Sequence, residues 1–223
     1  MTSKFDTYDL FGILVPGLLL IGCVAVLFSN VEVGKTPFPD AFGVVLLTAL
    51  AVFAGHFVQA IASVLEPIVF RSWGGRPSDL ALSGGLGSYL PSDTSGRVKD
   101  KLATAVGGSP DDHSLFLYAI QLSDGQNVGR ARRFSSLYAY HRALFTVVLL
   151  CIAMGIASMV SGTASGWSVW ERVGFFVAGC GLAILFWHRA RQQACYYVRE
   201  VLLSAEHALD NQKRKDSKPK TEE

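Results

Sequence analysis

Two polar side chains interrupt an apolar stretch that is long enough to cross a membrane as a helix. The stretch covers residues 42–65, contains no charged residue, and carries His56 and Gln59 one helical turn apart, behind Gly55. An imidazole titrates near neutral pH, so this pair could sense protons or line an ion path. The alternative is an interhelical hydrogen bond, with Gly55 allowing close approach of a second helix. We favour the packing role, because polar groups at membrane depth usually face other helices.

A second group of candidate residues flanks the points where apolar runs begin or end. Phe134, Tyr138 and Arg142 recur at a spacing of four, which places them on one face of a helix. The arginines could bind anionic lipid head groups or a phosphorylated ligand, but we favour simple anchoring at the membrane surface. The interfacial candidates are Arg132, Arg133, Tyr138, His141, Arg142, His188 and Arg189.

The sequence lacks the motifs of several common classes of enzyme. The interval between Arg133 and His141 is too long for the Arg-x4–6-His motif of certain ribonucleases, and no Gly-Lys-Ser/Thr loop, GxSxG or HExxH occurs. The four cysteines form no CxxC and no cluster with histidine, so we expect neither a disulfide nor a metal site. We expect no enzyme, no catalytic residue and no cofactor. The net charge of +2 is too small to indicate nucleic acid.

Four apolar runs must position these side chains. Half of the 223 residues are hydrophobic and only 17% are charged, which is unusual for a soluble domain of this length. We therefore predict an all-α integral membrane protein, built as a four-helix bundle with a small cytosolic helical layer and an amphipathic C-terminal helix. The apolar stripe of that last helix comprises Ala190, Ala194, Tyr197, Val201, Ala205 and Leu209.

The predicted segments follow one another along the chain. They are a cytosolic leader (1–9), a first membrane helix (10–28), an external connector (29–41), a second membrane helix (42–65), cytosolic loops and helices (66–142), a third membrane helix (143–160), a second external connector (161–169), a fourth membrane helix (170–188), a cytosolic helix (189–211) and a disordered charged tail (212–223).

The distribution of basic residues predicts the orientation. Lysine and arginine are frequent in 66–142 and after residue 188, whereas the two external connectors and their flanks hold only Lys35 and Arg172. By the positive-inside rule, both termini and the middle segment are cytosolic. We therefore expect His56 and Gln59 to lie near the level of Tyr138, His141 and His188.

One alternative concerns the first apolar run. Residues 20–23, Leu-Ile-Gly-Cys, match the lipobox of bacterial lipoproteins, in which the cysteine is acylated after cleavage. The apolar run continues past Cys23 to Phe28 and the leader is not basic, so we favour a membrane helix. Acylation of Cys23 stays open at this point.

Several short motifs of this chain, taken together, resemble those of a known group of proteins. Residues 8–12 (Tyr-Asp-Leu-Phe-Gly) are followed by Pro16-Gly17, then by Gly55-His56-x-x-Gln59, and then by Arg133-Phe134 with Tyr138 and Arg142. This set resembles small uncharacterised bacterial four-helix inner-membrane proteins, some of which are encoded near anti-phage defence genes. The resemblance implies an inner-membrane location and a membrane-effector role, and it implies no catalytic residues.

These observations lead to two functional expectations. The first is a non-enzymatic inner-membrane protein that acts as an oligomeric effector or pore controlled by its cytosolic helices. The alternative is a membrane-anchored scaffold that recruits a cytosolic partner through the middle segment and the C-terminal helix. The expected partners are the lipid bilayer, further copies of the chain and a cytosolic protein.

Overall fold

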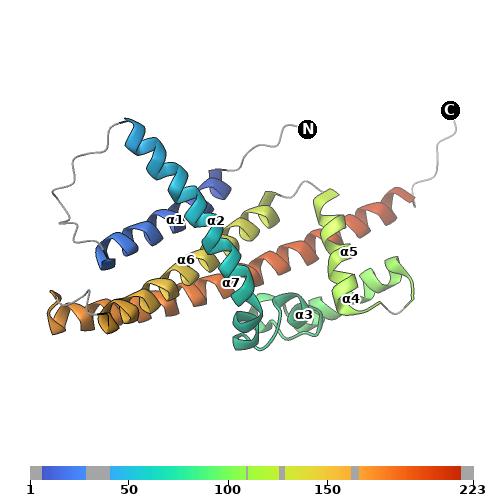
Figure 1. The fold of residues 1–223 in the computed structure, drawn as a ribbon. Coiled ribbons are helices and arrows are strands. Elements are labelled where there is room, and N and C mark those ends of the chain that lie inside the picture. The colour runs from blue at the N-terminus through green and yellow to red at the C-terminus, as the bar shows by residue number, and fades with distance from the viewer. Residues whose placement is uncertain (1–6, 29–40, 109, 126–128, 162–165, 217–223) are drawn as a thin grey trace. The chain divides into compact units, whose positions relative to one another are not determined.

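The computed structural model describes residues 7–28, 41–108, 110–125, 129–161 and 166–216. Within these ranges the chain is all-helical and has no strand, which confirms the all-α part of the predicted fold class. The elements are α1 (Thr7–Phe28), α2 (Ala41–Ser72), α3 (Pro77–Leu82), the short 3₁₀ turn η1 (Gly87–Tyr89), α4 (Ser92–Val106), α5 (Asp112–Gly125), α6 (Gly129–Val160) and α7 (Val169–Asp216) (Figure 1).

Three of these helices, α2, α6 and α7, are long and apolar enough to cross a membrane. Helix α1 carries a shorter apolar stretch, Gly12–Phe28. Large apolar side chains are exposed along the long helices, for example Phe53, Val177 and Ile184. Apolar side chains that are exposed in this number along a helix are typical of contact with lipid or with another protein. The helices therefore fit the predicted membrane protein.

The chain divides into two compact units. The first unit comprises Met1–Glu66 and Ser136–Ala190, and the second comprises Pro67–Ser135 and Arg191–Glu223. The long helices α2, α6 and α7 each contribute residues to both units. Each unit also has its own group of buried apolar side chains.

In the first unit, the backbones of α1 and α2 approach each other closely at two glycines. A Cβ atom added to Gly17 would overlap the backbone carbonyl of Ala51, and one added to Gly55 would overlap that of Ile13. Small residues allow this kind of backbone contact between membrane helices, where the lipid supplies no hydrophobic driving force for association. Gly55 therefore serves the close approach that the sequence predicts for it.

A small apolar cluster joins α2 to α6 beside this crossing. Val58, Ala143 and Val147 are buried, and the partly buried Leu20, Leu150 and Cys151 pack against them. Helices α1, α2 and α6 thus share one interior within the first unit.

The second unit has a larger apolar core. One face of α7 is buried against α3, α4 and α5, and its central side chains include Val198, Val201 and Leu202. From the other helices, Leu82, Leu86, Leu90, Val98, Leu102, Leu115, Phe116 and Ala119 complete the core. The predicted stripe of the C-terminal helix is confirmed: all of its members are buried except Tyr197, which is partly buried. The middle segment of the same chain covers this stripe from Tyr197 to Leu209.

Two helices extend beyond the segments predicted for them. Helix α2 continues past Leu65 to Ser72 with Pro67 inside it, although proline removes one backbone hydrogen bond. Val69 and Trp73, which lie beyond this proline, are buried in the second unit, and their burial offsets the loss.

At the other end of the chain, α7 continues to Asp216, so residues 212–216 are helical and not disordered. Lys213, Arg214 and Lys215 occupy its last turn, where positive charge interacts favourably with the helix dipole. The predicted leader contributes residues 7–9 to α1. The parts that lie outside the described residues are 1–6 of the leader, 29–40 of the first external connector, 162–165 of the second external connector, and 217–223 of the tail.

Candidate functional site

Three polar side chains of the first unit meet where the apolar run of α2 ends and that of α6 begins. The Tyr138 hydroxyl donates a hydrogen bond of 2.6 Å to Glu66 Oε1, and Arg142 Nη1 lies 2.9 Å from the same oxygen. Tyr138 and Arg142 share a helix face because they are one turn apart. The guanidinium carbon of Arg142 also lies 5.5 Å from the centre of the Tyr138 ring. A single carboxylate therefore joins α2 to α6.

Gln59 extends this network to α1. It precedes Glu66 by two helical turns and so lies on the same face of α2. Its Nε2 donates a hydrogen bond of 3.1 Å to the backbone oxygen of Gly12, and its Oε1 accepts a long hydrogen bond of 3.5 Å from Arg142 Nη2. We call Gln59, Glu66, Tyr138 and Arg142 the polar clamp, since together they connect three helices.

The clamp is largely shielded from solvent within the first unit. The side chain of Arg142 is 15% exposed and that of Glu66 is 26% exposed. Removing one member of such a pair leaves the other charge without compensation, which costs about 3–5 kcal/mol when the pair is fully buried. Arg142 Nε is buried and has no hydrogen-bond partner in the described part of the chain. The arginine therefore depends on Glu66 and Gln59 for its polar contacts.

The structure separates the predicted pair of His56 and Gln59. Gln59 belongs to the clamp, whereas His56 is exposed on α2. Neighbouring Gly55 and Val58 are both buried, so the helix turns its packed face toward α1 and α6 and leaves the imidazole outside. The clamp carries the interhelical contact that the sequence suggested for the pair, and it does so without His56.

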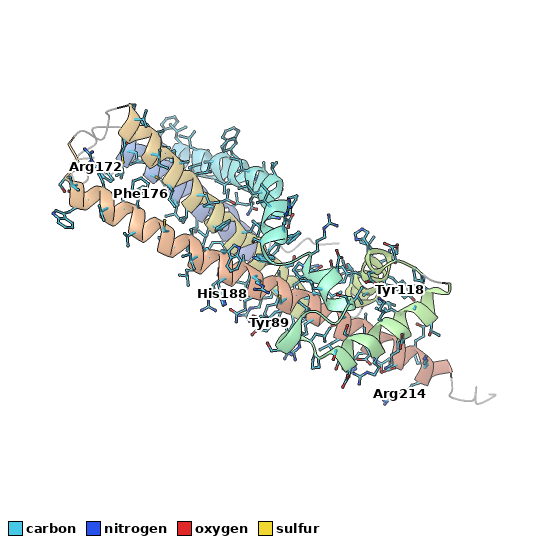
Figure 2. The ribbon with its side chains drawn as sticks, turned by 90° about the horizontal axis from the view of Figure 1, so that it is seen from below. Tyr89, Tyr118, Arg172, Phe176, His188 and Arg214 are labelled. Carbon is cyan, nitrogen blue, oxygen red and sulfur yellow. The ribbon has the colours of Figure 1, made fainter. Side chains whose placement is uncertain are left out.

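The other predicted residues are distributed differently. Tyr138 and Arg142 belong to the clamp. His141 Nδ1 lies 2.7 Å from the Leu137 backbone oxygen, and its ring faces Phe186 of α7 at 6.5 Å between ring centres. His188 (Figure 2) is exposed on α7, and so is Arg189. Arg132 and Arg133 are exposed near the start of α6, in the second unit.

Glu66 is the clamp residue that sequence reasoning missed. It is the first charged residue after an apolar run, and such a residue usually indicates only the end of a membrane segment. One signal was available. An acid ends the second apolar run and a base, Arg142, immediately precedes the third, and antiparallel neighbours would bring these two ends together.

The second unit contains a separate ionic cluster between α4 and α7. Glu206 accepts hydrogen bonds from Arg97 Nε and Lys101 Nζ, both at 2.8 Å, and Lys101 also contacts Asp210 at 2.9 Å. The two bases are one turn apart on α4 and the two acids are one turn apart on α7, so the faces match. We call Arg97, Lys101, Glu206 and Asp210 the ionic cluster.

The charges of this cluster shift one another's pKa values. Burial alone would raise the pKa of Glu206, but the hydrogen bonds from Arg97 and Lys101 outweigh it and hold this pKa below its usual range. The hydrogen bond from Lys101 likewise lowers the pKa of Asp210. Hydrogen bonds to Glu206 raise the pKa values of Arg97 and Lys101. All four groups are therefore held in their charged forms.

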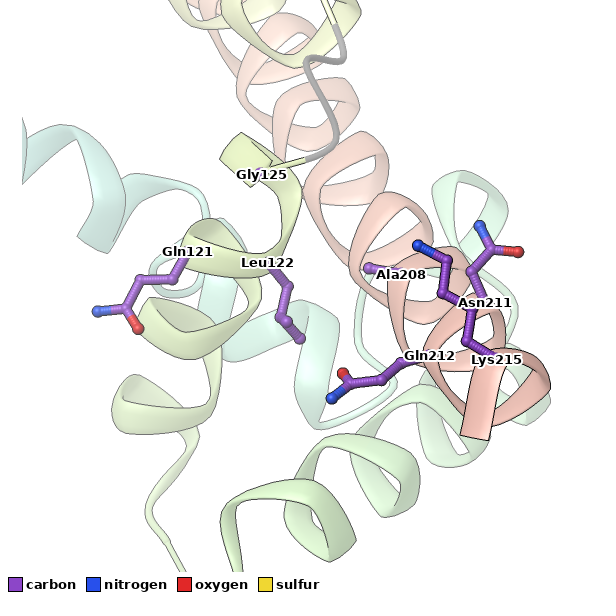
Figure 3. Close-up of a pocket in the computed structure, with 7 residues that line it drawn as sticks. All are labelled: Gln121, Leu122, Gly125, Ala208, Asn211, Gln212 and Lys215. Atoms are coloured by element: carbon purple, nitrogen blue, oxygen red, sulfur yellow. The ribbon is translucent and has the colours of Figure 1, made fainter. Parts of the chain in front are cut away.

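An open cleft of about 310 Å³ lies between α5 and α7 in the second unit. Its lining residues are Gln121, Leu122, Gly125, Ala208, Asn211, Gln212 and Lys215. Figure 3 shows Leu122 and Gln212 pointing toward each other across the cleft, while Gln121 points away. An apolar contact, an amide and an ammonium group in one place could receive a short segment that carries a carboxylate.

Comparison with known proteins gives no relative. No family model, no curated protein and no solved structure matches this chain. Functional inference therefore rests on the geometry of the two units.

Proposed function

We propose that this chain is a non-enzymatic membrane effector of the bacterial inner membrane, in which the polar clamp holds the membrane helices closed. In this proposal the four predicted runs cross the bilayer, and both termini and the second unit lie in the cytosol. The three long apolar helices and the placement of lysine and arginine support this arrangement.

The clamp is the observation that carries the proposal. Ion pairs shielded from water are weak sources of stability, and their best-attested use is to fix one arrangement against alternatives. Glu66 is the last residue of the first unit on α2, and Tyr138 lies two residues after Ser136, where α6 enters that unit. A change in the second unit would therefore reach the clamp through α2 and α6 directly.

Self-association supplies the second part of the proposal. A bundle of four helices is small for a conducting path, so several copies would have to line one. Exposed apolar side chains on α2 and α7, such as Phe53 and Ile184, offer faces for lipid or for a further copy.

The experiment compares ion permeability of liposomes that contain the wild-type chain, Glu66→Gln or Arg142→Met. We expect the wild type to be nearly sealed without a trigger and each clamp variant to raise the permeability at least tenfold. Glu171→Gln is the matched control, since Glu171 is an exposed carboxylate at the start of α7 whose partner is Ser168. Vesicle flotation establishes that each variant is inserted. If both clamp variants insert and the liposomes stay sealed, the effector proposal is wrong.

The cleft between α5 and α7 favours a second candidate, a membrane-anchored scaffold. Here the first unit is only an anchor, and the second unit binds a cytosolic protein through Gln212 and Lys215. Crosslinking in cells that carry the wild type or Gln212→Ala/Lys215→Ala tests this candidate. A specific partner that is lost in the double variant, together with sealed clamp variants, would favour the scaffold over the effector.

A further inference from the structure

Two thiols of the first unit contact each other inside the helix bundle. Cys23 of α1 and Cys151 of α6 are both free and partly buried, and their side chains are hydrogen-bonded to each other. The remaining cysteines are placed elsewhere, with Cys180 exposed on α7 and Cys195 buried in the core of the second unit. The contact between Cys23 and Cys151 is therefore selective.

The packing of the helices accounts for this contact independently. Helices α1 and α6 run in the same direction (Figure 1). Leu20 of α1 packs against the cluster that contains Val147, and Cys151 packs against the same cluster. Cys23 lies about one turn beyond Leu20, and Cys151 lies one turn beyond Val147. Because the two parallel helices are in contact at Leu20 and Val147, they are in contact again one turn later, at the two thiols.

We propose that Cys23 and Cys151 form a reversible disulfide whose oxidant is a lipid-soluble quinone. In the reaction, both S–H bonds break and one S–S bond forms. The two electrons and two protons pass to the quinone, which becomes the quinol. A disulfide needs Cβ atoms about 3.5–4.5 Å apart, so only cysteines that already lie side by side can form one without a movement of the backbone.

The surroundings of the thiols select this class of oxidant. Both cysteines lie within apolar runs that cross the membrane in our proposal, so an oxidant dissolved in water would reach them slowly. Thiol oxidation depends on access as well as on thiol reactivity. The bond would connect α1 covalently to α6, on the helices that the clamp also joins.

The experiment uses the full chain in liposomes treated with decylubiquinone, and measures intact mass and crosslinked peptides without reduction. We expect the chain to lose the mass of two hydrogen atoms, a peptide containing Cys23 to be joined to one containing Cys151, and dithiothreitol to reverse both changes. Cys180→Ser should behave like the wild type, whereas Cys23→Ser and Cys151→Ser should show no intramolecular disulfide. Because the peptide map is also made on the wild type, the result does not depend on the folding of any variant.

Several outcomes would overturn the proposal. One is that both thiols still react fully with N-ethylmaleimide in denaturant after quinone treatment. A second is a disulfide that involves Cys180 or Cys195. A third is an intact mass showing that residues 1–22 are removed and Cys23 is acylated, since an acylated sulfur cannot be oxidised to a disulfide. If copper–phenanthroline forms the bond and the quinone does not, the assignment of the oxidant is wrong.

Discussion

The polar clamp and the ionic cluster are built from the same kinds of charged side chain, yet their surroundings differ. In the clamp, the paired side chains are 15% and 26% exposed. In the cluster, the central Lys101 and Glu206 are similarly shielded at 26% and 11% exposed, but Arg97 is 58% exposed and Asp210 is 44% exposed, so water screens the attraction of these two outer members. Similar contacts are therefore expected to contribute different amounts to the stability of the two units.

The apolar neighbours of the two networks differ as well. The cluster lies beside a large core on α4 and α7, whereas the clamp lies beside a small group formed by Val58, Ala143 and Val147. Apolar packing provides little drive for helix association inside lipid, because lipid chains are equally apolar. We infer that polar and backbone contacts decide the arrangement of the first unit, and that apolar burial decides that of the second.

The largest expected effect comes from the core of the second unit. Leu202→Ala removes a fully buried side chain and should lower the free energy of unfolding by about 3 kcal/mol. Hydrogen exchange of the α4 and α5 amides, measured by mass spectrometry, should become faster. Leu203→Ala is the matched control, since Leu203 is only partly buried and should cost much less. If both variants lowered the free energy of unfolding equally, the conclusion that this core stabilises the second unit would be wrong.

The next effect concerns the clamp. Glu66→Gln should lower the stability of the first unit by about 2 kcal/mol, less than for a fully buried pair because both side chains retain some exposure. Thermal unfolding in detergent, monitored by near-ultraviolet circular dichroism, measures the change. In the double variant Glu66→Gln/Arg142→Met, part of the loss should be recovered, because no uncompensated charge remains. Strictly additive losses would show that the two side chains are not coupled.

A smaller effect is expected from pH in the second unit. Glu206 and Asp210 have lowered pKa values in the folded protein. Their contribution to the free energy of unfolding is therefore present above about pH 4 and is lost as the pH falls through these folded-state pKa values. Lys101 has a raised pKa, so its contribution is present below about pH 10 and is lost as the pH rises further. The protection factors of the α4 amides, which are exchange rates corrected for their intrinsic pH dependence, should therefore be largest between these limits. Glu206→Gln should flatten the acidic side of this profile, and an unchanged acidic side would contradict the role of the cluster.

The smallest effect should come from His56. Because its side chain is exposed on α2, His56→Leu should change stability by less than about 0.5 kcal/mol. Gln59→Leu, one turn away, removes the hydrogen bond to Gly12 and should cost about 0.6 kcal/mol, with a weaker association of α1. The comparison uses thermal unfolding and crosslinking between α1 and α2. A larger loss for His56→Leu than for Gln59→Leu would reverse the assignment made here.

Much of the fold could be predicted because local sequence determines it. Length and apolar composition predict the long helices, and the spacing of Ala194, Val201 and Ala205 predicts which face of α7 is buried. The end of α2 could not be predicted in the same way. Pro67 is a local signal to stop, but α2 continues past it and Trp73 is buried, and burial is set by tertiary packing rather than by the local sequence.

The candidate site was only partly predictable for the same reason. The residue types of His56, Gln59 and Arg142 indicate candidates for polar contacts. Which of them faces a neighbouring helix depends on the phase of each helix and on which helices are neighbours, and the local sequence does not determine the latter. Glu66 was overlooked because its importance comes from meeting Arg142, which follows it by more than seventy positions in the chain. Contacts of this kind require the order in which helices pack.

The crossing at Gly17 and Gly55 has a consequence for variation in this chain. The closest approach at each glycine is to a backbone carbonyl, that of Ala51 or of Ile13, and the side chain of Ile13 also lies against Gly55. The glycines themselves cannot change, because even a methyl group would have to displace a whole helix. Random mutagenesis followed by selection for correctly assembled protein should leave these two positions invariant, whereas Gly22, with open space around it, should accept alanine.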